Sequence, residues 1–327
     1  MTPARTQQST AKPAGTTRKV SSARRVFALH GWLGLSLGLP LLLICLSGAL
    51  AVFGHELDWL CNPAMRIRPE GPRLPLDAIY SKVQRAFPEA RIVYWQLSMG
   101  SCFADELSLS PRVETSGGRE TRVFVNPHTG VIQGVSGYLN VRSFLRAFHY
   151  YWFDTVTGWG FYLVAAFAFV LLGSVITGMA IYKRWWAGLF TLRLRRGRRL
   201  FFSDLHKLCG GWTLAFNFVI ALSAIYYLVE WKTDWELVTP RLSAERIAQI
   251  PPNATPVPLD EQLENARHHF PSLRVANIAF PETPADPLYF DGQAAAWVVR
   301  ERANKLLLDP YDGSVVFIQR GENLASG

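Results

Sequence analysis

The chain has 327 residues, 49% of them hydrophobic, and a formal net charge of +9. This hydrophobic share is high for a soluble enzyme and suits a protein that combines membrane spans with folded domains outside the membrane. The basic residues cluster beside the hydrophobic runs, so the charge pattern indicates membrane topology and argues against a nucleic-acid partner.

The N-terminal part predicts a tail followed by a membrane span. Residues 1–25 are rich in Ser, Thr, Ala, Pro and basic residues and predict a disordered tail. The apolar run at 26–54 is long enough to cross a bilayer. A cleaved secretory signal is the alternative, since Arg24-Arg25 resembles a twin-arginine element and Ala49-Leu50-Ala51 resembles a cleavage site. The run is longer than a usual signal segment, so we interpret it as a retained span.

The polar stretch at 55–146 predicts the first soluble domain, a small α+β unit. Hydrophobic periodicity predicts one amphipathic helix, three short strands and a turn. The helix is expected at 74–87, the strands at 91–97, 106–110 and 121–125, and the turn at 126–130. Cys61 and Cys102 are the only cysteines of this domain. Their spacing is equally compatible with a disulfide and with two free thiols.

Two further apolar runs, at 152–182 and 206–231, predict a second and a third span. The loop between them, 183–203, contains the cations Lys183, Arg184, Arg193, Arg195, Arg196, Arg198 and Arg199. By the positive-inside rule this loop is cytoplasmic, together with the N-terminal tail, and the soluble domains lie on the other side. In a Gram-negative host this describes an inner-membrane protein with periplasmic domains.

Residues 232–327 predict a second soluble domain that repeats the first. Pro75-Leu76-Asp77 returns as Pro258-Leu259-Asp260, and Asn126-Pro127 returns as Asp309-Pro310, each about 183 positions later. The predicted fold class is therefore an α-helical integral membrane protein with two small α+β domains and an internal repeat. A second copy of the 152–182 span would start just past residue 327. The protein therefore has either three spans or a fourth helix beyond this sequence, and we favour the fourth helix.

Histidines open two of the apolar runs. His30 is followed by Gly34 and His206 by Gly210, so each ring has a glycine one helical turn away, on the same face. Two such imidazoles beside small residues are the ligands of a bis-histidine b-type haem. The alternative is a pair of interfacial histidines that bond headgroups or carbonyls. We predict that both rings lie near the cytoplasmic face.

His55 and His149 are predicted to lie at the opposite face, where a second haem would sit. About 25 residues separate His30 from His55, or about 37 Å of helix. His149 is the favoured ligand at this level, with a histidine of the expected fourth helix as its partner and His55 as a neighbour or substitute. The remaining histidines are interpreted as polar surface residues, His128 in a turn and the pair His268-His269 on a helix.

Several segments together resemble a known family, the PepSY-associated transmembrane proteins. The matching segments are Leu29-His30-Gly31-Trp32-Leu33-Gly34, Ser47-Gly48-Ala49-Leu50, Phe148-His149-Tyr150, Thr177-Gly178, Asp204-Leu205-His206-Lys207 and the two units that end in Asn126-Pro127 and Asp309-Pro310. The resemblance implies PepSY-like soluble domains, haem b, and the reduction of ferric siderophores at the inner membrane. The family pattern closes with a further span that opens on a Leu-His-Phe-Gly-like element, which this sequence lacks.

No G-x-G-x-x-G, Walker, C-x-x-C-H or H-E-x-x-H motif occurs in the sequence. The chain therefore offers no nicotinamide site, and its electrons are expected from a cytoplasmic reductase, a flavoprotein or the quinol pool. Two functions stay open: a haem-containing ferric-siderophore reductase, and a non-catalytic membrane module whose soluble domains bind a partner protein or sense a ligand.

Overall fold

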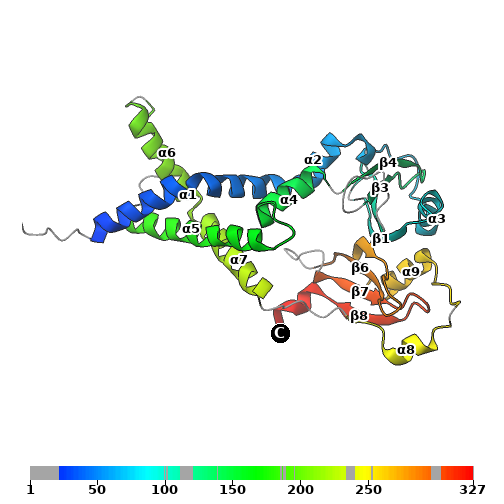
Figure 1. Ribbon diagram of the computed structural model, residues 1–327. Helices are drawn as coiled ribbons and strands as arrows, with labels where there is room; N and C mark the ends of the chain where they lie inside the picture. The colour runs from blue at the N-terminus through cyan, green and yellow to red at the C-terminus, as the bar shows by residue number, and fades with distance from the viewer. Residues whose placement is uncertain are drawn as a thin grey trace, which may run out of the picture. The chain divides into compact units, whose positions relative to one another are not determined.

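The computed structural model (Figure 1) describes residues 22–326, apart from gaps at 99, 101, 111–120, 138, 185, 187–188, 195, 233–239, 252 and 296–302. The predicted tail at 1–25 thus lies almost wholly outside the described residues. The chain divides into two compact units. The helical unit comprises Met1–Ile44 and Gly158–Thr233, and the sheet unit comprises Cys45–Thr157 and Asp234–Gly327.

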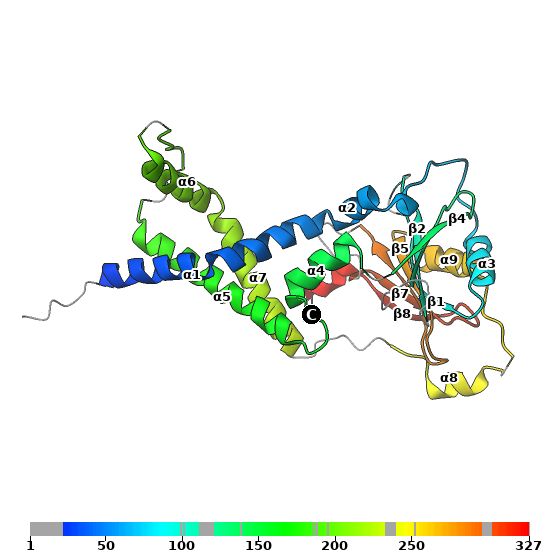
Figure 2. The ribbon, with the colours of Figure 1, turned by 45° about the horizontal axis from the view of Figure 1, so that its top comes forward.

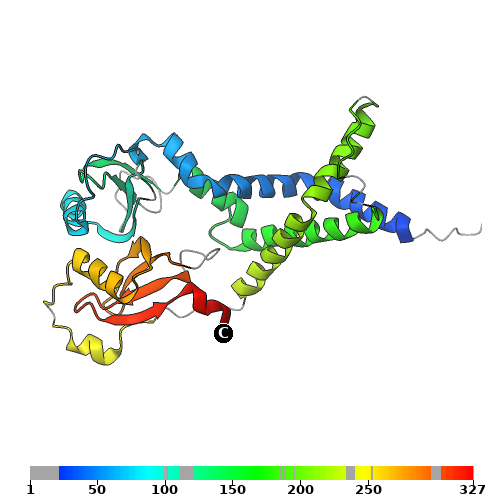
Figure 3. The same cartoon turned by 180° about the vertical axis from the view of Figure 1, so that it is seen from behind.

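Two helices are long and apolar enough to cross a membrane. They are α1 (Ser22–Val52) and α5 (Trp159–Ile181), of 31 and 23 residues (Figures 1 and 3). A bilayer core of about 30 Å needs about 20 helical residues, so each is sufficient. Their outer surfaces are apolar, with Leu35 of α1 90% exposed. Such a surface suits contact with lipid rather than water.

The third apolar segment is bent, whereas the sequence predicted one uninterrupted span at 206–231. Its two helices, α6 (Arg198–Trp212) and α7 (Leu214–Lys232), meet at an angle of 61°. At the break, the Thr213 hydroxyl donates to the Cys209 carbonyl at 2.8 Å and accepts from the Asn217 amide at 2.9 Å. Threonine hydroxyls that bond the preceding turn bend helices. The structure therefore has two spans, or three if the bent pair crosses as one.

The sheet unit contains one antiparallel sheet of eight strands (Figure 2). The first half supplies α3 (Leu76–Ala86), β1 (Arg91–Gln96), β2 (Asp105–Ser110), β3 (Thr121–Val125) and β4 (Ile132–Ser136). The second half supplies α9 (Leu259–His269), β5 (Arg274–Ala279), β6 (Leu288–Gln293), β7 (Lys305–Leu308) and β8 (Val315–Gln319). The strand order is β4-β3-β2-β1-β5-β6-β7-β8, so the halves join where β1 pairs with β5.

Both halves share one hydrophobic core between the sheet and the two helices. Trp95 of β1 and Ile79 of α3 are fully buried in it, as are Phe270 after α9 and Phe290 of β6. The sequence predicted two small domains, and the structure unites their cores through the common sheet. Apolar residues of α3 and α9 both belong to this core, so the two helices cover the same face.

A reciprocal pair of carboxylates joins the N-termini of α3 and α9. Asp260 accepts from the Leu76 and Asp77 backbone N–H groups at 2.8 and 3.1 Å. Asp77 in turn accepts from the Leu259 and Asp260 N–H groups at 2.9 and 3.0 Å. The first N–H groups of a helix have no partner within the helix, and each carboxylate satisfies two of them on the opposite helix. We call this pair the aspartate clamp.

Two short helices connect the first span to the sheet and the sheet to the second span. α2 (Gly54–Cys61) packs beside α4 (Val141–Tyr151), and Asp58 of α2 accepts from the Val141 and Arg142 N–H groups at 2.7 and 3.2 Å. Burial raises the pKa of Asp58, although these backbone bonds oppose the shift. Since α4 ends with Trp152 in a left-handed conformation, α5 begins at Trp159 and not at the predicted residue 152.

The remaining elements are short. They are α8 (Ala244–Gln249) and the 3-10 helices η1 (Pro63–Met65) and η5 (Gly321–Ser326). The four cysteines of the chain, Cys45, Cys61, Cys102 and Cys209, are all free and exposed, which resolves the open question of a Cys61–Cys102 disulfide in favour of thiols.

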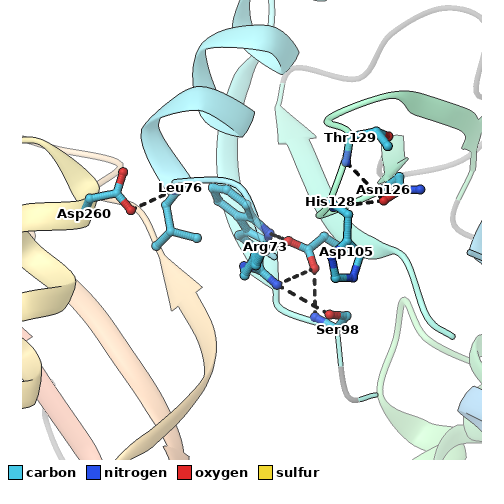
Figure 4. A network of polar contacts seen from close by, with 9 residues as sticks. Arg73, Leu76, Ser98, Asp105, Asn126, His128, Thr129 and Asp260 are labelled. Carbon is cyan, nitrogen blue, oxygen red and sulfur yellow. Dashed lines mark hydrogen bonds and ion pairs between the residues drawn. The ribbon is translucent and has the colours of Figure 1, made fainter. Parts of the chain in front are cut away.

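A buried carboxylate fixes the chain before α3 to the sheet (Figure 4). Asp105 of β2 accepts from Trp95 Nε1 at 2.8 Å and from the Ser98 N–H at 2.9 Å, and it pairs with Arg73. Its side chain is fully buried, so these charge-assisted bonds replace the water that it loses. Sequence patterning did not single out this group.

Candidate functional site

Two histidines from separate helices meet inside the helical unit. His30 lies in the first part of α1, and His206 lies in α6, before the bend. Their ring centroids are 6.0 Å apart and the ring planes are inclined by 68°. The matched His and Gly spacings predicted that the two rings lie at the same level, and the structure brings them together.

A hydrogen bond to α5 determines which nitrogen of His30 carries the proton. His30 Nδ1 lies 2.9 Å from Thr177 Oγ1, and the Thr177 hydroxyl donates its single proton to the Gly173 carbonyl at 2.6 Å. The hydroxyl therefore accepts from His30, so Nδ1 is protonated and Nε2 keeps its lone pair. Imidazoles that bind metals are held in this way, through the nitrogen that does not bind.

Glycines around the pair have two different roles. Gly178 lets the His30 ring lie against α5, because a Cβ there would lie 3.3 Å from His30 Cε1. Gly34 and Gly210 border open space, since a Cβ at either position would meet nothing within 4 Å. Of these two, Gly210 lines the cavity described next. Gly34 is not among the residues that line that cavity.

A cavity of about 440 Å³ opens beside both rings. It is lined by Phe27, His30, Leu171, Ser174, Val175, Gly178, Met179, Ile181, Tyr182, Ser203, His206, Lys207, Gly210, Gly211, Leu214 and Asn217. The lining is mostly apolar, and its polar side chains are those of His30, His206, Ser174, Tyr182, Ser203, Lys207 and Asn217. This volume and composition are typical of sites that bind a small molecule or cofactor.

The donor set fits a haem iron. Two imidazoles that bind one metal ion at about 2 Å each hold their ring centroids roughly 6 Å apart, and the observed separation is 6.0 Å. Because the neutral His30 ring carries its proton on Nδ1, the lone pair of Nε2 is available to a metal ion. The apolar lining of the cavity suits a macrocycle. His30 and His206 are thus compatible with two axial ligands of one haem.

An ion pair anchors the helix that carries His206. Asp204 is 3% exposed and accepts from Arg193 Nε and Nη2, both at 2.7 Å. The Arg193 backbone N–H adds a third, longer bond of 3.3 Å. Bidentate pairs of this kind restrict geometry as well as stabilise it. The basic loop is therefore fastened to α6 two residues before His206.

His149 lies in the sheet unit, on α4, and packs directly on α1. A Cβ at Gly48 would lie 2.8 Å from His149 Nδ1 and 3.0 Å from its Nε2, so only glycine leaves room for the ring. The ring also makes an edge contact with Tyr150, with centroids 5.3 Å apart. This contact links two segments that the sequence singled out separately, Ser47-Gly48-Ala49-Leu50 and Phe148-His149-Tyr150.

His55, the weaker candidate ligand, is placed by different neighbours. It lies on α2 with its ring stacked on Phe103, at a centroid distance of 4.9 Å and an interplanar angle of 16°. Its Nδ1 is buried and has no hydrogen-bond partner among the described residues. Burial lowers the pKa of His55, and the charge of Arg142 lowers it further, so the ring is neutral at pH 7.

The other histidines lie in the sheet unit. His268 and His269 are exposed on α9, as predicted, with ring centroids 5.1 Å apart. His128 lies in the predicted turn and is half-buried, and its Nδ1 is buried and lacks a hydrogen-bond partner among the described residues. The Asn126 side chain accepts from the His128 and Thr129 N–H groups of this turn.

Sequence patterning missed the residues that support the histidines. Thr177 was noted in the Thr177-Gly178 segment of the family resemblance, and its 147 positions of separation from His30 gave no sign of a contact. Arg193 was read only as a topological charge, and Asp204 only as part of a motif. A signal for Asp204 was nevertheless available, since an acidic residue in an apolar helix beside a basic loop requires a partner.

Comparison of the sequence with known protein families identifies the family of the chain. The chain matches the family model described as the PepSY-associated TM region over residues 27–300. No curated protein matches the chain. The match covers most of the sequence and contains all four candidate histidines, α5, most of α1, the first soluble segment and the second soluble segment as far as residue 300. The protein therefore belongs to the family of PepSY-associated transmembrane proteins.

Proposed function

We propose that the protein is a haem b reductase of the bacterial inner membrane, which passes electrons outward to a ferric siderophore and so releases Fe(II) for uptake. The observation that supports this most is the pairing of His30 with His206 beside an apolar cavity of about 440 Å³. Membership of the family and the membrane spans are consistent with it.

The two histidines and the residues that support them each have a role in this proposal. His30 and His206 would hold the haem iron, Thr177 would hold the Nδ1 proton of His30, and the Arg193–Asp204 pair would keep α6 in place. A haem iron with two imidazole ligands supplies one-electron transfer without an open coordination position for substrate. The apolar residues of the cavity exclude water and thereby favour a bound macrocycle.

The reaction transfers one electron to each Fe(III) of the substrate. The sequence has no dinucleotide-binding motif, so the electron comes from a cytoplasmic reductase, a flavoprotein or the quinol pool. Siderophore oxygens are hard ligands that bind Fe(III) more tightly than Fe(II), so reduction loosens the iron. The substrate meets the protein on the side of the sheet unit, which the basic loop assigns to the periplasm by the positive-inside rule.

A second haem at the outer level is the part of the proposal that involves His149. Its close packing on Gly48 supports a defined position for the ring. Of the other histidines of this chain, His55 is the one proposed as a substitute partner. Two haems at two levels would carry electrons across the bilayer in two steps.

The proposal also includes an internal duplication of a PepSY-like unit. Each half has one helix followed by four antiparallel strands, and the aspartate clamp uses corresponding residues of the two halves. The two fused units then form the periplasmic surface that receives the ferric chelate.

Anaerobic reduction of a ferric hydroxamate by the dithionite-reduced protein tests this function. We expect the reduced haem bands to disappear on addition of the Fe(III) chelate, with one Fe(II) trapped by a chromogenic chelator per electron lost. The matched control is the Ga(III) chelate, which has the same charge and shape but accepts no electron. Bands that persist with both chelates would contradict the proposed substrate. A purified protein without haem bands would favour the non-catalytic module.

A further inference from the structure

Lys207 gives the cavity of the helical unit a positive charge. Its side chain lines the cavity beside His206, and its Nζ lies 5.6 Å from the centroid of the Tyr182 ring. A cation over an aromatic face is held by the ring quadrupole, which restrains the flexible lysine stem. Since Tyr182 also lines the cavity, the ammonium group is kept at the cavity wall.

This charge has no acidic counterpart in the cavity. None of the described residues that line it is Asp or Glu. The nearby carboxylate, Asp204, is close enough for the Lys207 charge to act on it, but Asp204 does not line the cavity and already accepts both arms of the Arg193 guanidinium at 2.7 Å. An ammonium group in an apolar setting is costly unless an anion compensates it. The cavity is therefore suited to a ligand with an apolar body and an anionic group.

We propose that Lys207 binds the anionic group of the ligand, which is a propionate carboxylate if the ligand is haem b. This assignment rests on the proposed haem function. A propionate is an acceptor for a charge-assisted hydrogen bond from the ammonium group, while the macrocycle contacts the apolar lining. Lys207 is thus a positioning residue that orients the ligand about the axis between His30 and His206.

The test compares haem b with its dimethyl ester, in which both propionates are neutral. The full chain is prepared without haem and titrated with each probe, and binding is followed by the bis-histidine absorption spectrum. The variants are Lys207→Gln and Lys207→Met, which remove the charge, and Lys207→Arg, which keeps it. Arg199→Gln is the matched control, because Arg199 lies exposed on the same helix and is not among the lining residues of the cavity.

We expect wild type, Lys207→Arg and Arg199→Gln to bind haem b roughly tenfold more tightly than the ester, as one charge-assisted hydrogen bond predicts. In Lys207→Gln and Lys207→Met this preference should disappear. If both variants retain the preference while the bis-histidine spectrum forms normally, the role of Lys207 is wrong and the haem proposal stands. If wild type gives no bis-histidine spectrum with either probe, both proposals fail.

Discussion

At the scale of single residues, Thr177 defines which nitrogen of His30 would be free for the proposed haem iron. Its hydroxyl accepts from His30 Nδ1 and donates to the Gly173 carbonyl. These two hydrogen bonds fix the imidazole in the tautomer protonated at Nδ1 and restrict the rotation of the ring. Outer-shell partners of this kind typically change the affinity for a metal group by about tenfold to a hundredfold.

Thr177→Val keeps the shape of the side chain and removes the hydroxyl. We expect its haem affinity to fall by about tenfold or more, because Nδ1 of His30 loses its acceptor. Thr177→Ser retains the hydroxyl and should bind haem as wild type does. Haem titration of the apo protein measures both variants. Equal affinities of Thr177→Val and wild type would show that the contact only packs the helices.

A second residue-level prediction concerns corresponding turns of the two halves. Asn126 folds the first turn as a neutral side chain, whereas Asp309 at the corresponding place is 1% exposed and pairs with Arg246 at 2.6 Å. Arg246→Ala should lower the Tm by several degrees, because it leaves a buried carboxylate unpaired.

Asp309→Asn provides the matched test of this explanation. The double variant Arg246→Ala/Asp309→Asn should be more stable than Arg246→Ala alone, because the neutral amide needs no cation, as Asn126 shows in the first half. Thermal unfolding followed by circular dichroism gives the four Tm values of the cycle. Additive effects of the two substitutions would show that the ion pair carries no coupling.

Some residues of the candidate site could be predicted from the sequence alone, and others could not. His30 and His206 could be predicted because each opens an apolar run with a glycine one turn later, a local pattern. The contacts of Thr177 with His30 and of Arg193 with Asp204 depend on how helices pack, and spacing along the chain does not encode that packing. His128 was correctly predicted to lie in a turn, but a local pattern does not reveal that its Nδ1 is buried.

At the scale of elements, the aspartate clamp connects the two halves at the N-termini of α3 and α9. Asp77→Ala and Asp260→Ala should each destabilise the sheet unit by about 1 to 2 kcal/mol, the usual cost of losing an N-terminal cap. The Asn variants keep one acceptor oxygen and should lose less.

Urea unfolding of the full chain can be followed by the fluorescence of Trp95 in a background in which the other tryptophans are replaced. This signal reports on the sheet unit because Trp95 is fully buried in its core. Each carboxylate accepts from a different pair of N–H groups, so the double Ala variant should lose the sum of the stability changes of the two single variants. Unfolding midpoints that do not move in either single variant would show that the clamp does not stabilise the junction.

Local patterns predicted most elements of the first half, including the strand at 121–125 with its observed bounds. They missed β4, whose five residues carry little alternation, and the bend at Thr213. The bend depends on the Thr213 hydroxyl bonding the preceding turn, which hydropathy does not detect. Pairing of β1 with β5 joins segments about 180 residues apart, and single-sequence periodicity carries no information about such a register.

At the scale of the whole molecule, the basic loop predicts the orientation of the protein. In a background with the four exposed cysteines replaced by serine, a cysteine at Arg196 should resist a membrane-impermeant thiol reagent in intact cells. A cysteine at Glu89, exposed in the sheet unit, should be labelled once the outer membrane is permeabilised. Lysed cells, in which both positions should react, are the control. Labelling at position 196 and not at position 89 would contradict the predicted orientation of the protein and, with it, the proposed outward direction of electron transfer.

Haem content and the reduced spectrum of histidine variants decide whether the cavity beside His30 and His206 holds a cofactor. His30→Ala and His206→Ala should each lose the same haem and its bis-histidine bands, because one remaining axial ligand holds the iron weakly. His268→Ala, which removes an exposed histidine of the sheet unit, should keep the haem content and spectrum of wild type. Equal haem content and identical reduced spectra in all four proteins would contradict the assignment and make the two rings structural.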